Sequence, residues 1–131
     1  YYGMTLTDDK NKNKNIPGWK KSSQFLKAHS NVFIETGEDG TGNLYNSNNL
    51  KSCIRKYKNS MEIITADGGF DFSIDFNKQE QMSSKLIIAQ VAYAIVMQKQ
   101  HGVFILKLFD VFTQFTQDII YLLTSYCFFY F

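Results

Sequence analysis

The sequence predicts an α/β protein with a mostly parallel sheet and helices on both faces. Short apolar runs of strand length alternate along the chain with longer stretches of helical periodicity, a pattern typical of strand–helix–strand units. One apolar run, Val103–Asp110 (VFILKLFD), lacks the polar alternation of a surface strand. We therefore predict that this run is a central parallel strand covered on both faces.

The first third of the chain supplies two expected strands and one helix. Tyr1–Leu6 is predicted as a strand that starts without a loop or cap before it, so we expect a truncated domain. Thr7–Gly18 interleaves lysines with asparagines and is predicted as a solvated loop; the alternative is a basic loop over a nucleic-acid backbone. Trp19–Ala28 is expected to be helical, and the short apolar run Val32–Ile34 to be a strand.

A glycine-rich loop and a second helix come next. Glu35–Leu44 (ETGEDGTGNL) lacks the G-x-G-x-x-G spacing and the Lys-Ser/Thr pair of phosphate-binding loops. It is predicted to be a flexible acidic loop that accepts hydrogen bonds from a ribose or an adenine amine, or a simple turn. Asn46–Lys58 is predicted as a helix with Asn or Ser at its start, and it leads into the strand that begins at Met61.

The longest expected helix is Lys78–Gln100. From Leu86 to Met97 it is apolar nearly all round, and only Gln90 breaks the run, so we expect it to be buried on both sides. Its apolar part is too short for a membrane span. His101 is predicted to cap the helix end, and a catalytic role for it is not favoured, because it lies at the opposite end of the strand from Lys107.

The C-terminal region is predicted to hold one more helix and one more strand, and the composition suits a folded domain. Thr113–Tyr126 is predicted as a helix capped by Thr113, and Cys127–Phe131 as the start of a strand. A hydrophobic content of 44% suits a folded domain, and a net charge of +2 leaves the class of partner open. Cys53 and Cys127 lie in no metal-binding spacing and are expected to be reduced, non-catalytic thiols.

Two charged residues stand where predicted strands end. Asp67 follows an apolar run and precedes two glycines; a ligand-facing carboxylate and a plain Asp-Gly-Gly turn are both open. Lys107 interrupts the run of its strand. Burial lowers the pKa of a lysine amine and lets it act as a base, whereas a lysine that snorkels out of the sheet does no chemistry. Right-handed crossovers bring neighbouring strand ends to one edge, so these two residues are expected to meet over a ligand.

Successive blocks of the chain resemble one known family. The blocks are YGMTL, EDGTGNL, ITADGGF, QKQHG, FILKLFD and FTQFTQDIIYLL, in this order and over nearly the whole chain. They resemble the FtsJ-like cap-specific mRNA ribose 2'-O-methyltransferases. The resemblance implies a Rossmann-like methyltransferase fold, binding of S-adenosylmethionine, and methylation of the ribose 2'-hydroxyl of the first transcribed nucleotide of capped mRNA, with no metal required.

The resemblance also assigns roles to residues of this chain. Asp67 matches the Asp, and Lys107 the second Lys, of the family's Lys-Asp-Lys-Glu tetrad, in which that Lys is the proton acceptor. Asp39, Asn43 and Leu44 match the segment that contacts the adenosyl part of the cofactor. Asp67 is also expected to contact the cofactor. Asn43 stands where an acidic residue is expected in some relatives.

Some features of the family are expected outside this sequence. The glycine-rich cofactor loop and the first tetrad Lys should precede Tyr1, and the tetrad Glu should follow Phe131, so we expect a partial domain that is incomplete at both ends. Two other classes stay open: a nucleotide-binding oxidoreductase, which the missing G-x-G-x-x-G counts against, and a catalytically inactive RNA-binding or partner-docking relic. We expect an intracellular protein, nuclear or cytoplasmic, or in a viral factory if the source is viral.

Overall fold

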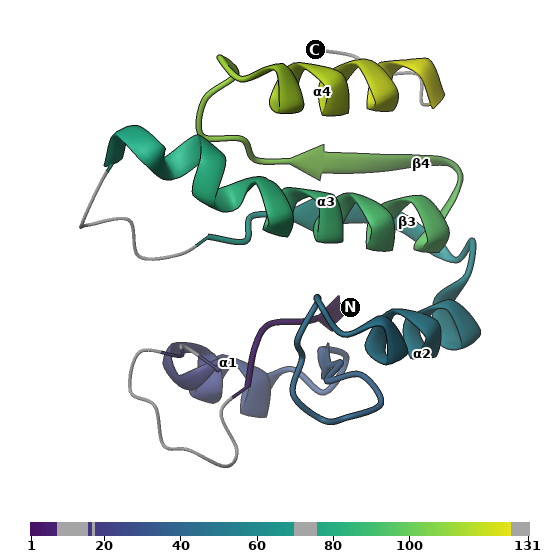
Figure 1. Ribbon diagram of the computed structural model, residues 1–131. Coiled ribbons are helices and arrows are strands. Elements are labelled where there is room, and N and C mark those ends of the chain that lie inside the picture. The colour runs from purple at the N-terminus through teal and green to yellow at the C-terminus, as the bar shows by residue number, and fades with distance from the viewer. Residues whose placement is uncertain (8–15, 17, 70–75, 127–131) are drawn as a thin grey trace.

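Strands and helices alternate in the computed structural model, which describes residues 1–7, 16, 18–69 and 76–126. The elements are β1 (Tyr2–Gly3), the 3-10 turn η1 (Lys20–Ser22), α1 (Ser23–Ala28), β2 (Phe33–Ile34), α2 (Ser47–Tyr57), β3 (Met61–Ala66), the 3-10 turn η2 (Phe76–Lys78), α3 (Gln79–Met97), β4 (Gln98–Leu106) and α4 (Gln114–Tyr126) (Figure 1). The predicted α/β alternation is confirmed. The strand expected at 127–131 and most of the loop at 7–18 lie outside the described residues.

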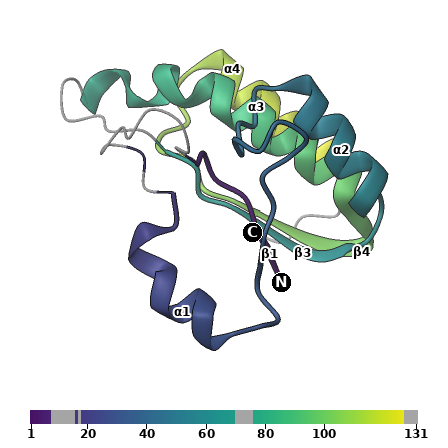
Figure 2. The same cartoon turned by 90° about the horizontal axis from the view of Figure 1, so that it is seen from below.

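The four strands pair in parallel, as predicted. β1 pairs with β2, and β3 pairs with β4, which gives two separate two-stranded sheets within the described residues. In the longer pair Ile63 lies opposite Val103 and Ala66 opposite Leu106. Figure 2 shows α2, α3 and α4 together on one side of the strands and α1 on the other. Because β3 and β4 are parallel, their carboxyl ends lie at the same edge of the sheet.

The largest cluster of buried apolar side chains lies between the helices and one face of the β3–β4 sheet. Its fully buried members are Ala66, Ile87, Val91, Ala94, Phe104, Ile119 and Leu123. Side chains alternate between the faces of a strand, so Phe104 and Leu106 face the helices. Burial of these groups is the main favourable term that holds α3 and α4 on the sheet.

The expectation that both faces of this sheet are covered is wrong for the described residues. Ile63, Val103 and Ile105 alternate with the core side chains and are 66%, 51% and 56% exposed. The expectation that α3 is buried all round is also wrong, because Ile88 and Ile95 are about half exposed. An apolar run shows that a face can be buried, and it carries no information on which face the rest of the chain covers.

The helix ends follow local hydrogen bonding. The Asn46 side chain accepts a hydrogen bond from the backbone amide of Asn48, which confirms the predicted cap of α2. The end of α3 differs from the prediction: the helix stops at Met97, where the N–H of Gln98 donates to Ala94 O. His101 is therefore no helix cap and instead lies within β4 with a φ of 63°, near an irregularity in the strand pairing.

A buried carboxylate fixes the end of β2 against α2. Glu35 is 8% exposed and accepts hydrogen bonds from Tyr57 Oη at 2.6 Å, Lys56 Nζ at 3.0 Å and the Gly37 amide at 2.8 Å. Burial by itself raises the pKa of Glu35, but these donors outweigh burial and leave that pKa lowered. Glu35 therefore stays charged and holds the start of the loop that leads to α2.

Within the part of the chain that the structure describes, no helix combines the length and apolar character that a bilayer crossing requires.

Adjacent isoleucines on α3 test where the core lies. Ile87 is 2% exposed and Ile88 is 48% exposed, so the two positions share helix context and differ in burial. Ile87→Ala should lower the free energy of unfolding by roughly 2–5 kcal/mol, because it removes transfer energy and leaves a cavity. Ile88→Ala should cost less than about 1 kcal/mol. Denaturant titration measures both values, and equal losses would contradict this placement of α3.

Candidate active site

The ends of β3 and β4 bring Asp67 and Lys107 together. Beyond the last strand pair, the Lys107 amide donates to Ala66 O at 2.9 Å, so the ladder continues by one hydrogen bond. The Lys107 Nζ lies 2.7 Å from Asp67 Oδ1. The structure thus places the two predicted residues side by side at the carboxyl edge, while their catalytic roles stay a prediction.

Of the two alternatives for Lys107, burial and a side chain that snorkels out of the sheet, the structure shows the exposed one. Its side chain is 56% exposed and that of Asp67 is 69% exposed. The ring of Phe109 lies 5.5 Å from the Lys107 ammonium, at a distance that suits a cation–π contact. Lys107 follows the last paired residue of β4, so its side chain extends past the edge of the sheet rather than into the core.

Location distinguishes this ion pair from another on the same strands. Lys99 Nζ lies 2.7 Å from Glu62 Oε1, near the start of β4 and β3, with side chains 49% and 74% exposed. Exposed ion pairs of this kind contribute only about 0–1 kcal/mol to stability. The two ion pairs have the same N–O distance and similar exposure, and of the two only the Asp67–Lys107 pair lies where ligands bind in parallel α/β sheets.

A glutamine of α3 holds the backbone directly after Asp67. The Gly68 amide donates to Gln90 Oε1 at 2.8 Å, and Gln90 Nε2 donates to Leu86 O at 3.2 Å. Gln90 is 7% exposed. Its position as the single polar residue of an apolar helical run was the signal in the sequence, but the sequence did not show its partner.

A glutamate of α3 holds the loop that follows Lys107. Glu80 Oε1 accepts from the Thr113 amide at 2.9 Å and from its hydroxyl at 2.7 Å, and Glu80 Oε2 accepts from the Phe112 amide at 3.3 Å. Burial raises the pKa of Glu80, but the hydroxyl groups of Thr116 and Thr113 and these amides lower it by more. Thr113 also accepts from the Thr116 amide at 3.3 Å, which confirms it as the cap of α4. No motif or spacing in the sequence marks Glu80 for this role.

The expected cofactor residue Asp39 is occupied within its own loop. Its Oδ1 accepts from the Thr41 amide at 2.9 Å, the Thr41 hydroxyl at 2.7 Å and Asn49 Nδ2 at 2.8 Å, while Oδ2 accepts from Asn46 Nδ2 at 2.6 Å. The Thr41 donors are the main reason that the pKa of Asp39 lies well below its ordinary value. Asp39 organises the loop between β2 and α2.

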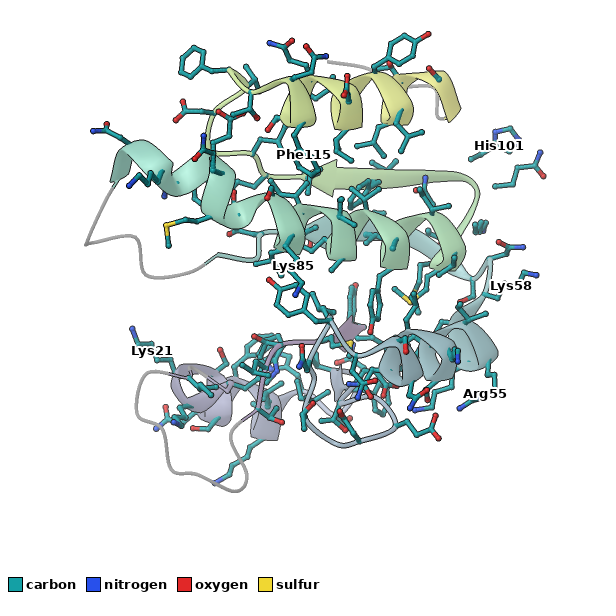
Figure 3. All side chains as sticks on the ribbon, viewed as in Figure 1. Lys21, Arg55, Lys58, Lys85, His101 and Phe115 are labelled. Carbon is teal, nitrogen blue, oxygen red and sulfur yellow. The ribbon has the colours of Figure 1, made fainter. Side chains whose placement is uncertain are left out.

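Asn43 and Leu44 lie in the same loop and face other neighbours. Asn43 Oδ1 accepts from the Tyr45 amide at 2.9 Å. Leu44 lines a shallow pocket of about 240 Å³ between α2 and α3, where Lys85 lies 4.7 Å from the Tyr45 ring centroid (Figure 3). Among the described residues, no hydrogen bond joins Asp39 or Asn43 to Asp67, and the contact of Asp39, Asn43 and Leu44 with a cofactor stays a prediction.

Two further groups bear on the chemistry. In the described ranges no cluster of three or more His, Cys, Asp or Glu side chains could hold a metal ion. Cys53 is a free thiol in the core, and burial raises its pKa to about 11. A thiol of this kind is a poor nucleophile at neutral pH.

The parallel strands, the helices beside them and the charged pair at the carboxyl edge define a Rossmann-like α/β protein, a class in which ligands bind at the carboxyl ends of the strands. The chain matches the family described as FtsJ-like methyltransferase over residues 2–131, and it belongs to that family.

Three of the relatives that match share one name. The chain is 38% identical to the "Cap-specific mRNA (nucleoside-2'-O-)-methyltransferase 1" of Trypanosoma brucei brucei over 67% of the chain and 24% of the relative. It is 32% identical to the Trypanosoma cruzi protein of that name over 94% of the chain and 32% of the relative. It is 33% identical to the human one over 96% of the chain and 15% of the relative. The chain thus spans at most about a third of these relatives' length, and no solved structure matches it.

Glu80 gives the site a measurable dependence on pH. Because its folded-state pKa is lowered, the stability it contributes is present above its ordinary pKa of 4.5 and is lost as pH falls below that value. Glu80→Gln should therefore lower the melting temperature at pH 7, and its difference from the wild type should shrink as pH falls from 5 to 3. Thermal unfolding at a series of pH values measures this difference. A constant difference across the range would contradict the role of the charge.

Proposed function

We propose that the chain carries the Asp67–Lys107 part of a methyltransferase domain that acts on the ribose 2'-hydroxyl of the first transcribed nucleotide of capped mRNA. The observation that carries the proposal is the 2.7 Å contact between Lys107 Nζ and Asp67 Oδ1 at the carboxyl edge of parallel strands, in a chain of the FtsJ-like family. The shared name of the matched relatives supports the choice of capped mRNA as substrate.

The assigned roles follow from the chemistry of a hydroxyl nucleophile. A ribose 2'-oxygen attacks a methyl group efficiently only when it is aligned and when a base accepts its proton. Lys107 Nζ is that base in our proposal. Asp67 Oδ1 lies 2.7 Å from Lys107 Nζ, so Asp67 holds the amine in place and contributes orientation. RNA bound over this edge would exclude water from both side chains, which are exposed without it.

S-adenosylmethionine, when bound, supplies the methyl group. The residues present fit part of a site for it. Asp67 and the backbone of Gly68 and Gly69 lie at the open end of β3, and Asp67 Oδ2 makes no contact among the described residues that would occupy it. Asp39 has less capacity to bind a cofactor, because Oδ1 already accepts three hydrogen bonds inside the loop and only Oδ2, which accepts one, has room for another donor. We assign cofactor contact at this edge to Asp67 and the two glycines.

One observation favours a second function. Lys107 is 56% exposed, and an amine in that position is also suited to contact with a phosphate. A catalytically inactive RNA-binding or partner-docking relic of the same fold is therefore the alternative. Binding of capped RNA without any methyl transfer to it would identify the relic.

Lys107, directly after β4, and Lys99, near the start of β4, allow a matched test of the proposed base. Lys107→Ala in the full-length protein should reduce methyl transfer from labelled cofactor to capped RNA by roughly 10²- to 10⁴-fold, the range for loss of a general base. Asp67→Ala should also remove most transfer. Lys99→Ala removes an ion pair of equal length at the opposite end of the strands and should leave the rate near that of the wild type.

Calorimetry distinguishes loss of chemistry from loss of binding. Lys107→Ala should bind the cofactor as the wild type does. A Lys107→Ala protein that keeps its transfer rate, or one that loses activity only as much as Lys99→Ala does, would remove Lys107 from the mechanism.

A further inference from the structure

The backbone at Asp67 is held on both sides by separate hydrogen bonds. On the preceding side, Ala66 O accepts from the Lys107 amide at 2.9 Å. On the following side, the Gly68 amide donates to Gln90 Oε1 at 2.8 Å. Only one residue lies between the two anchors, and that residue is Asp67. The direction of its side chain toward Lys107 therefore depends on both.

Without Gln90, the anchor on the following side is lost. Gly68 and Gly69 come directly after Asp67, and glycine has more backbone freedom than any other residue. The Asp67 side chain is 69% exposed and contacts Lys107 Nζ through Oδ1, so packing does not fix its carboxylate. We propose that Gln90 is a positioning residue for the reaction: it fixes the strand end after Asp67 and so holds the Asp67 carboxylate against Lys107.

The environment of Gln90 explains why a polar side chain occupies this place. A polar group buried in an apolar helix is unfavourable unless its hydrogen bonds are made. Gln90 is 7% exposed, and both ends of its amide are bonded, Oε1 to the Gly68 amide and Nε2 to Leu86 O. The Leu86 carbonyl belongs to the helix itself, so the Gly68 contact is the one that reaches the strand end.

The fit of Gly68 against the helix shows that this contact is close. A Cβ atom at Gly68 would lie 2.8 Å from Gln90 Oε1 and 3.1 Å from Leu86 Cδ2. A side chain at Gly68 would therefore displace the ends of the Gln90 and Leu86 side chains or move the strand end away from α3. Gly68 and Gln90 form a matched pair in which one partner has no side chain and the other supplies the acceptor.

This inference rests on the proposed function, and Gln90→Met tests it. Methionine has a similar length and cannot replace the amide oxygen as an acceptor. In the full-length protein we expect kcat for methylation of capped RNA to fall by about 10-fold or more, since small misplacements of reacting groups are costly. The KM for RNA and the Kd for S-adenosylmethionine should change little. Hydrogen exchange of the peptide that contains Gly68 should become faster.

Gln114→Met is the matched control. Gln114 lies on the exposed surface of α4, where its Nε2 donates to Asp118 Oδ1 at 2.7 Å. This variant should keep the wild-type kcat and the wild-type exchange at Gly68. If Gln90→Met does not fold, Gln90→Leu, which also lacks the acceptor and suits a buried helix position, should give the same loss of kcat.

The outcomes separate this inference from the function on which it rests. An active wild type with an unchanged kcat in the folded Gln90→Met protein would overturn the role of Gln90 alone. A rise in the KM for RNA with kcat unchanged would also overturn it, because a positioning residue acts on the chemical step. A wild type that transfers no methyl group to capped RNA would overturn the proposed function and the role of Gln90 with it.

Discussion

The register of β3 against β4 is the constraint on which the site depends. Ala66 lies opposite Leu106, so the residues that follow, Asp67 and Lys107, leave the sheet at the same level. Side chains alternate between the faces of a strand, and a slip of one residue would send Lys107 to the other face. Burial of Phe104 against the helices fixes the register, because the slipped arrangement would expose it. The core therefore determines the geometry of the charged pair.

Helix α3 connects this core to the site in three ways. Ile87 and its buried neighbours pack on the sheet, Gln90 binds the backbone after Asp67, and Glu80 binds the loop after Lys107. Glu80 lies in the first turn of the helix and Gln90 lies just past its middle, and the N-terminal part of α3 lies beside the carboxyl ends of the strands (Figure 1). A single rigid element thus holds both strand ends, which suits a site that needs two side chains in fixed relation.

The sequence predicted the parts of this arrangement that follow from local pattern and from general rules of topology. Alternating strands and helices, with their crossovers, were enough to predict that Asp67 and Lys107 meet. The bond between Gly68 and Gln90 spans 22 residues and depends on how the helix packs, which periodicity does not specify. The exposure of Lys107 and the internal bonding of Asp39 likewise depend on neighbours in space, so pattern alone left both open.

The central claim is that Asp67 and Lys107 act as one unit, and a double-mutant cycle on methyl transfer tests it most directly. Residues that act as a unit give strongly non-additive losses of rate. The transfer rate of the Asp67→Ala/Lys107→Ala protein should equal that of the slower single variant within about threefold, a small difference on this scale. Losses that multiply across the two substitutions would show that the residues act independently and would contradict the account.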